Sequence, residues 1–405
     1  GFIEALDYTP AQQPTGVTMT PVATFMAHHQ GMSIVALANV LLGQVAQRWG
    51  MAPVHLEAVG SLLHERTPRD VSRLYAPLSG PSLQTVHAPT PHLQSQLIPG
   101  MAAIEPTHLL SNGRYQVTLR ANGAGWSRWG HTDLSRWRDD VLRDAHGSFL
   151  YLRWATMQAP VSLTLHPAPD PRAHYQSTFH TDRVRFEAHW PHAQAHTTVW
   201  VSPEDDIEFR QVELYNQSDT AIELELMSAW EVSLSPARAD EAHPAFANLF
   251  VRAEWQPEHQ ALRFERQPRL PDEPTLLAAH FLVESDAEVL SVQHQCDRLH
   301  WAGRNQHGSQ PRASFPPATS PDACDTASSC ETGLDPVAAL SVRLRIAPHA
   351  KARVTFATAA ANDPVTLHAI IDKYRQPSHV ERASLMSATL RRIRLQTLSL
   401  SAAQF

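Results

Sequence analysis

The spacing of apolar residues divides the chain into helical ends and a long middle part with strand-like alternation. Between Phe25 and Trp49 the apolar residues recur at helical spacing, and Gly50 ends the pattern, which predicts a buried helix. A second helical stretch covers residues 55–66 and stops before Pro68, which disfavours continuation. We therefore expect the first sixty-odd residues to be helical.

A proline-rich segment follows these helices. From Pro68 to Pro106 the chain has few apolar clusters and also contains Pro77, Pro81, Pro89, Pro91 and Pro99. This composition is typical of an extended, semi-rigid connector. We therefore predict a linker over residues 68–106, which separates a helical unit at residues 1–67 from the rest.

Past this connector the apolar period changes from helical to alternating, as expected for strands with one buried face. The clearest candidates are Tyr115–Leu119, Phe149–Trp154, Val161–Leu165, Arg183–Trp190, Thr197–Val201, Ile207–Tyr215, Ile222–Leu226, Ala278–Val283 and Val342–Ile346. No amphipathic helix of ten or more residues separates successive strands, so parallel βαβ units are disfavoured. The sequence predicts a mainly β fold, a large antiparallel sandwich over residues 107–362.

Two other segments complete the predicted organisation. Residues 304–336 are rich in Pro, Ser, Ala and Asp with little periodicity, which indicates a long surface loop. From Pro364 onward the pattern becomes helical again, with Leu367, Ile370 and Tyr374 on one side. We expect residues 363–405 to form a helical linker.

Composition narrows the possible functions. Hydrophobic residues make up 43% and charged residues 18%, as in an ordinary folded protein. The formal net charge is -7, and no block of Lys or Arg is present to neutralise a run of phosphates, which argues against nucleic acid as a partner. The three cysteines, Cys296, Cys324 and Cys330, are too few for a disulfide framework and fit a reducing compartment.

No segment has the sequence of a membrane span or a leader. The most apolar stretch, Ile34–Leu42, contains Asn39 and falls well short of the ~20 residues that a bilayer requires. The first residues, GFIEALDYTP, have no initiator Met and no basic or hydrophobic leader region. We expect an internal fragment of a longer chain, without membrane contact of its own.

Three stretches resemble one family, the cyclic β-1,2-glucan synthetases. GFIEALDYTP, FMAHHQGMSIVALANVLL and LLHERTPRD are similar to the end of the family's glucoamylase-like domain. NGRYQVTLRANGAGWSRWG with LSRWRDDVLRDAHGSFLYLR, and VSPEDDIEFRQVELYNQSDTAIELELMSAWEVSLSPARADEAHPAFANLFV, resemble the β-sandwich shared with glycosyltransferase family 36 and glycoside hydrolase family 94. From Arg304 to Leu334 the sequence departs from the family pattern, with PDACDTASSCET in the loop.

The resemblance implies a domain order and a function. It implies a supersandwich of galactose-mutarotase type, preceded by the remnant of an (α/α) barrel and followed by a helix that leads to a second (α/α) barrel. The parent enzyme would make cyclic β-1,2-glucan as a glycosyltransferase, in the cytoplasm of a bacterium and tethered to its inner membrane. The fragment alone would be inactive, binding a β-glucan oligosaccharide and the adjoining barrels without any cofactor.

Glu4 is the candidate catalytic residue that the resemblance supplies. A retaining glycosidase or transglycosylase needs two carboxylates about 5 Å apart. Glu4 would be one member of this pair, with Asp7 one helical turn later in contact with sugar. The alternative is that both residues lie in a first helical turn and complement the helix dipole.

The HHQG run offers a second candidate. His28, His29 and Gln30 match a barrel motif of the family and could contact a sugar. A zinc site is disfavoured, because adjacent histidines on a helix point in different directions and no further ligand follows at the usual spacing. A helix start with structural hydrogen bonds is the alternative.

In the predicted sandwich, a Gly-rich aromatic turn from Asn122 to Trp129 is the best local candidate for sugar binding. An indole covers the apolar face of a pyranose, while charged side chains bond to hydroxyls. The candidate substrate-binding residues there are Trp126, Arg128, Trp129, Arg136, Arg138 and Asp139. The alternative is that the tryptophans are packing anchors and the arginines are structural ion pairs.

Two other functions remain open for the chain as a whole. It could be a purely architectural spacer between two barrels, or part of a phosphorylase of the cellobiose-phosphorylase type.

Overall fold

The computed structural model describes residues 5–8, 18–23, 26–52, 94–102, 104–138, 145–154, 159–268, 273–303, 308, 311 and 328–399. The chain divides into two compact units, residues 1–86 and residues 87–405. The predicted helix at residues 55–66 lies outside the described residues, as does most of the predicted connector.

The smaller unit differs from the expectation of an all-helical segment. Strands β1 (Ala5–Asp7) and β2 (Thr20–Val22) pair antiparallel, so Asp7 lies in a strand and not in a first helical turn. The predicted helix is divided into α1 (Ala27–Leu41) and α2 (Val45–Gly50), because Gly43 and Gln44 adopt positive φ angles of 62° and 59°.

The prediction that this first helix is buried is wrong for the residues that the structure describes. Helix α1 has no buried residue, and its apolar side chains are largely exposed, including Ile34 at 67% and Leu37 at 62%. Apolar spacing determines which face of a helix seeks a partner, but the partner itself must come from elsewhere in the protein.

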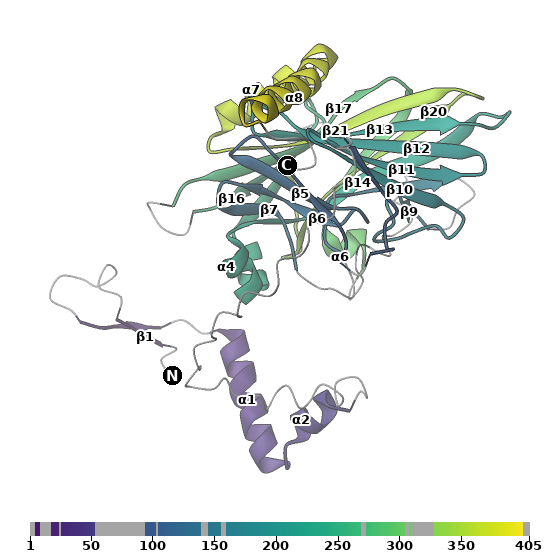
Figure 1. Cartoon of the computed structure of the whole chain (residues 1–405). Coiled ribbons are helices and arrows are strands. Elements are labelled where there is room, and N and C mark those ends of the chain that lie inside the picture. The colour runs from purple at the N-terminus through teal and green to yellow at the C-terminus, as the bar shows by residue number, and fades with distance from the viewer. Residues whose placement is uncertain are drawn as a thin grey trace, which may run out of the picture. The chain divides into compact units, whose positions relative to one another are not determined.

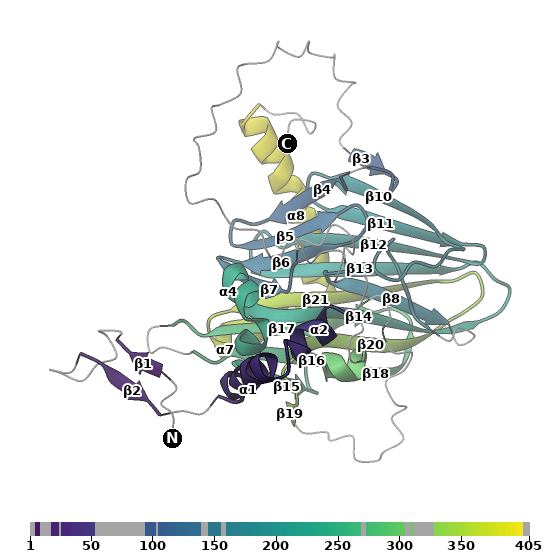
Figure 2. The ribbon, with the colours of Figure 1, turned by 90° about the horizontal axis from the view of Figure 1, so that it is seen from below.

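The larger unit contains two sheets of antiparallel strands. The ten-stranded sheet has the order β19-β15-β16-β17-β21-β13-β12-β11-β10-β3. Figure 2 shows β10 to β13 side by side, with β3 next to β10. The strands of this sheet are β3 (Gln94–Leu97), β10 (His174–His180), β11 (Val184–Trp190), β12 (Ala193–Val201), β13 (Ile207–Asn216), β15 (Val251–Gln256), β16 (Ala261–Arg266), β17 (Leu276–Ser285), β19 (Ser328–Cys330) and β21 (Lys351–Ala361).

The nine-stranded sheet packs against the first. Its path is β18-β20-β14-β7-β6-β5-β4, with β8 pairing β14 and β9 pairing β8. Its strands are β4 (Thr107–Ser111), β5 (Tyr115–Arg120), β6 (Gly125–Trp129), β7 (Thr132–Ser135), β8 (Phe149–Trp154), β9 (Val161–Ser162), β14 (Ile222–Ser235), β18 (Glu288–Asp297) and β20 (Pro336–Ile346). The fold is therefore mainly β, as the sequence predicts.

Alternation along each strand separates the inner core from the outer faces. On β13, Val212 and Leu214 join the core between the sheets, whereas Ile207 and Phe209 belong to a second cluster on the outer face. Successive side chains of a strand point to opposite faces, so one strand supplies both clusters.

Short and long helices cover the outer faces. Helices α7 (Pro364–Tyr374) and α8 (Pro377–Thr397) lie on the outer side of the ten-stranded sheet (Figure 1). Leu367 and Ile371 of α7 join the cluster of Phe209 there. Trp301 of α6 (Arg298–Trp301) packs with Tyr151 and Met227 of the other sheet. Helices α4 (Ala237–Ala242) and α5 (Pro244–Asn248) follow β14.

Several predicted elements agree with the structure, and the limits of others differ. Strand β8 has the predicted bounds, and the helical pattern beyond Pro364 becomes α7 and α8. Strand β3 lies inside the predicted 68–106 connector, where its four residues pair with β10. Strand β9 is shorter than the predicted Val161–Leu165, and β19 lies within the segment predicted as a loop. Within the described residues, no helix has the length and apolarity needed to cross a membrane.

Candidate functional site

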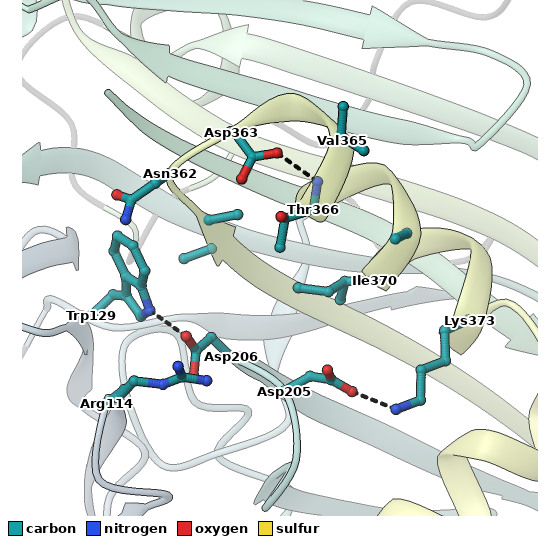
Figure 3. A pocket seen from close by; sticks show the side chains of 13 residues that line it. Arg114, Trp129, Asp205, Asp206, Asn362, Asp363, Val365, Thr366, Ile370 and Lys373 are labelled. Atoms are coloured by element: carbon teal, nitrogen blue, oxygen red, sulfur yellow. Dashed lines mark hydrogen bonds and ion pairs between the residues drawn. The ribbon is translucent and has the colours of Figure 1, made fainter. Parts of the chain in front are cut away.

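A cavity of about 540 Å³ opens where the two sheets meet helix α7 (Figure 3). It is lined by side chains from three parts of the sandwich: the β4–β5 turn and β6, the turn before β13, and the segment from β21 into α7. The lining residues with polar or aromatic side chains are Arg114, Trp129, Asp205, Asp206, Asn362, Asp363, Thr366 and Lys373. Trp129, a residue predicted to bind sugar, is one of the lining residues.

The alternation of strand β6 directs Trp129 into this cavity. Ser127 and Trp129 point toward the ten-stranded sheet, where they reach Glu208 and Asp206 respectively. The strand begins at Gly125, where an added Cβ would lie 2.0 Å from the backbone oxygen of Thr118. Only glycine therefore permits the close approach of β5 and β6 that sets the register of Trp129.

Asp206 connects the two sheets at the base of the cavity. Its Oδ2 accepts a hydrogen bond from the indole Nε1 of Trp129 at 2.8 Å. Its Oδ1 accepts from Nε of Arg114 at 3.2 Å and from Nδ2 of Asn112 at 3.3 Å. Asp206 is buried, whereas the Arg114 side chain is 69% exposed, so the guanidinium lies at the mouth of the cavity.

A second carboxylate binds helix α7. Oδ2 of Asp205 lies 2.7 Å from Nζ of Lys373 and accepts a hydrogen bond of 2.7 Å from the hydroxyl of Tyr374. Burial lowers the pKa of Lys373, but hydrogen bonds to Asp205 and Glu204 outweigh this effect, so the pKa lies above its ordinary value. Burial also raises the pKa of Tyr374 well above its usual range. Lys373 is therefore a permanent cation beside the cavity.

This arrangement has the chemistry of a binding pocket for a neutral polar ligand. An indole supplies an apolar surface, Arg114 supplies N–H donors, and the side-chain amide of Asn362 supplies both a donor and an acceptor. Both oxygens of Asp206 and one oxygen of Asp205 already accept from protein donors. These carboxylates are therefore suited to position ligand-binding groups rather than to exchange protons.

Strand β6 carries two other predicted residues, which lie on the face opposite to Trp129. The Trp126 ring packs on Trp137, with centroids 4.6 Å apart, and Arg120 lies 4.9 Å above the same Trp137 ring. Nε of Arg128 lies 2.6 Å from Oδ1 of Asp133. Trp126, Arg128 and Trp129 thus belong to a strand, not to the predicted turn, and they do not form one surface.

Arg136 and Arg138 lie in a buried ionic network away from the cavity lining. Arg136 is 3.0 Å from Glu231, 3.2 Å from Asp240 and 3.1 Å from Asp335, and Arg138 also reaches Asp240 at 2.7 Å. Burial opposes the charge of Arg136, but Glu231 and Asp240 outweigh it and raise its pKa. These contacts agree with the alternative that both arginines form structural ion pairs and do not bind sugar.

The remaining predicted residues belong to the smaller unit or lie outside the described residues. Asp7 is in β1, and His28, His29 and Gln30 are exposed in the first turn of α1. Glu4 and Asp139 lie outside the described residues. The two histidine rings contact each other, with centroids 4.1 Å apart.

Sequence reasoning did not single out Arg114, Asp205, Asp206 or Lys373 as site residues. The two aspartates lie in a Ser-Pro-Glu-Asp-Asp turn before a strand, a pattern that by itself indicates only a turn. Lys373 is 244 positions after Trp129 in the sequence, so only the fold brings them to one cavity.

A larger cavity of about 840 Å³ lies elsewhere in the sandwich, with Trp154 and Trp190 in its lining. The Trp190 side chain is buried, and its Nε1 donates to Asp170 at 3.1 Å. Its ring meets Trp154 edge-on at 5.0 Å. Because Trp190 packs against protein, it offers less free aromatic surface than Trp129.

The cysteines form a contact that the sequence does not predict. Cys330 of β19 hydrogen bonds with Cys296 of β18, and this contact, together with His294, lowers the Cys330 pKa. Cys324 lies outside the described residues. Cys330 is thus placed beside a cysteine of the other sheet.

Comparison with known proteins agrees with the fold and the family resemblance. Residues 101–377 match the family model "Glycosyl hydrolase 94, supersandwich domain". A cyclic β-(1,2)-glucan synthase of Rhizobium meliloti (strain 1021) is 30% identical over 384 residues, which cover 93% of this chain and 13% of that protein. The chain therefore spans only a small part of this relative's length.

Among solved structures, a bacterial glucoamylase complexed with acarbose covers 73% of this chain and 40% of its own, with 6% identity and a TM-score of 0.38. A 4-α-glucanotransferase from Thermococcus litoralis covers 66% of this chain and 39% of its own, with 7% identity and a TM-score of 0.28. The match to the family model covers more than half of the chain, and the chain belongs to the glycosyl hydrolase 94 supersandwich family.

Proposed function

We propose that this chain is the sugar-handling part of an enzyme of cyclic β-1,2-glucan synthesis, and that the cavity beside Trp129 binds a segment of β-glucan. The observation that carries the proposal is that the indole of Trp129 lines a cavity of about 540 Å³. The indole is fixed by the hydrogen bond from its Nε1 to the buried Asp206. A ring of this kind covers the C–H face of a pyranose, and the polar groups around it bond to hydroxyls.

The position of the cavity also supports a role beside a second domain. Helix α7 forms one wall, and α8 continues from it. The family resemblance implies a barrel of phosphorylase type after this helix, so a glucan held at Trp129 would lie close to that barrel's entrance. The parent enzyme would be tethered to the bacterial inner membrane through other segments.

We further propose that the chain alone does not turn over substrate. A retaining transfer needs one carboxylate as nucleophile and one as acid and base. In the cavity, Asp206 accepts from Trp129 and Arg114, and Asp205 pairs with Lys373. The role of these carboxylates is positioning, and catalysis would belong to the parent's barrels.

Calorimetric titration of the full chain with short β-1,2-glucan oligosaccharides tests this proposal. We expect Trp129→Ala to weaken binding by at least about tenfold, because it removes the central aromatic contact. Trp129→Phe keeps the aromatic face and loses only the bond to Asp206, so it should retain most of the affinity.

Trp126→Ala is the matched control, because Trp126 is on the opposite face of the same strand and packs on Trp137. It should leave the affinity unchanged while lowering the melting temperature. If the wild-type chain binds no oligosaccharide, or if Trp129→Ala and Trp126→Ala lose affinity equally, the cavity is not the binding site. Absence of binding would favour the architectural role, a spacer between two barrels.

A further inference from the structure

The outer face of the ten-stranded sheet carries a histidine and glutamate cluster that the proposed function does not use. On β11, Val184, Phe186 and Ala188 point into the core between the sheets, so Glu187 and His189 point outward. On β12 the same alternation places His196 on the outer face. All three side chains are half-buried.

Strand pairing brings these three side chains together. His196 is the direct cross-strand partner of Glu187, and His189 follows Glu187 by two positions on the same face. Their ligand atoms all lie within 4.8 Å of one another. Nε2 of His189 is 3.4 Å from a carboxylate oxygen of Glu187, and the two imidazole centroids are 5.9 Å apart.

We propose that Glu187, His189 and His196 bind one zinc ion on this face of the sheet. Two imidazole nitrogens and one carboxylate oxygen are a ligand set that zinc takes, with bond lengths of about 2.0–2.2 Å and an open fourth position. Tetrahedral bonds of that length hold ligand atoms roughly 3.3 Å apart, so side-chain rotation closes the site without moving the strands. The proposal does not depend on glucan binding at Trp129.

Arg185 contacts two members of the cluster. One of its terminal nitrogens donates to Nδ1 of His196 at 2.7 Å, and its Nε lies 2.9 Å from Oε1 of Glu187. The Arg185 side chain is 40% exposed, so it can move into solvent when the ion binds. Its positive charge opposes binding of a cation, and zinc must displace it from both contacts.

The next strand supports His196 without competing for the metal. Tyr215 of β13 packs on the His196 ring, with centroids 5.2 Å apart. Glu213 lies across from His196 in the register, but it pairs with Lys351 at 2.5 Å. Among the described residues, the ligand set therefore consists of these three side chains, which matches a site that keeps one position for water.

Competition of the full chain against a chromophoric zinc indicator tests the proposal. We expect one zinc ion per chain with half-saturation at or below about 10 μM. His189→Ala and His196→Ala should each weaken binding by about tenfold or more. His349→Ala is the matched control, because the His349 side chain is exposed and pairs with Asp219, outside the proposed set of ligands. It should leave the affinity unchanged.

The variant Arg185→Gln distinguishes a zinc site from a purely structural cluster of ion pairs, because only a zinc site predicts a change in zinc affinity. It removes the competing charge, so zinc should bind more tightly by about tenfold. Cobalt added to the wild-type chain should give the intense visible absorption of a four-coordinate site, lost in His196→Ala. Failure of the wild-type chain to bind zinc in this range, or equal binding by His189→Ala and His349→Ala, would overturn the proposal.

Discussion

His280 is a titratable residue in the middle of β17 that the packing keeps neutral. It is 1% exposed, its Nδ1 lies 2.9 Å from the hydroxyl of Thr358, and its Nε2 has no hydrogen-bond partner among the described residues. Burial, with a further contribution from the charge of Arg210, lowers the pKa of His280 to about 3. The unfolded chain would take up a proton at this residue near pH 6.5.

Because the pKa of His280 is lower in the folded than in the unfolded chain, this residue should make the free energy of unfolding fall at acid pH. Below about pH 6.5 the unfolded state binds a proton that the folded state refuses until about pH 3, so stability is lost as the pH falls through this window. The contribution is about 1.4 kcal/mol per pH unit at most. Urea unfolding at pH 7.5 and pH 5.0 should show that wild type loses about 2 kcal/mol more than His280→Gln.

The control for this measurement is His349→Gln, which changes an exposed histidine paired with Asp219. It should follow the wild-type pH dependence. An identical loss of stability in wild type and His280→Gln between the two pH values would contradict the assignment to this residue.

Single residues also show how far the candidate site could be predicted. The sequence predicts Trp129 as a candidate, because it lies in a Gly-rich aromatic stretch and an indole can cover the apolar face of a pyranose. The sequence does not indicate its partner Asp206, because Asp206 is 77 positions away and joins the site only when the two sheets stack. The sequence groups Trp126 with Trp129, but strand alternation places Trp126 on the other face, where it packs on Trp137. The sequence predicts residue chemistry, and the register decides which residues share a face.

At the level of elements, α7 combines signals that the sequence carries with a packing surface that it does not. Asp363 caps the helix by accepting from the backbone N–H of Thr366 at 2.8 Å, and Pro364 occupies the first turn. These are common helix-start signals. The apolar spacing predicted a helix, but its partner, the outer face of β13, β17 and β21, followed only from the sheet order.

Two substitutions on α7 separate packing from helix propensity. Ile371 is fully buried in the outer cluster with Phe209, whereas Val365 of the same helix is 78% exposed. Ile371→Ala should lower the free energy of unfolding by about 2–5 kcal/mol, through lost burial and a residual cavity. Val365→Ala should change it by less than about 0.5 kcal/mol. Denaturant unfolding measures both, and equal effects would mean that α7 is not anchored on the sheet.

At the scale of the whole chain, the change of apolar period predicts a boundary between a helical part and a β-sandwich. It could not predict that the sheet begins before the connector ends, because the four residues of β3 are too short a pattern to distinguish from an extended linker. Their pairing with β10 became visible only in the assembled sheet. The order of ten strands in one sheet likewise depends on contacts between distant segments.

This boundary gives a test of how the molecule divides. Residues 87–405 contain both sheets, their core and the helices α7 and α8, so this segment should fold alone with the melting temperature of the sandwich in the full chain. A segment that begins at residue 107 lacks β3 and leaves the backbone groups of β10 unpaired at the edge. Its melting temperature should fall by about 2–4 °C for each kcal/mol lost.

Differential scanning calorimetry of the full chain and of the two shortened segments measures these melting temperatures. Equal melting temperatures for the two shortened segments would show that β3 adds nothing to the sheet, and a collapse of both would show that residues 1–86 are needed for the sandwich to fold.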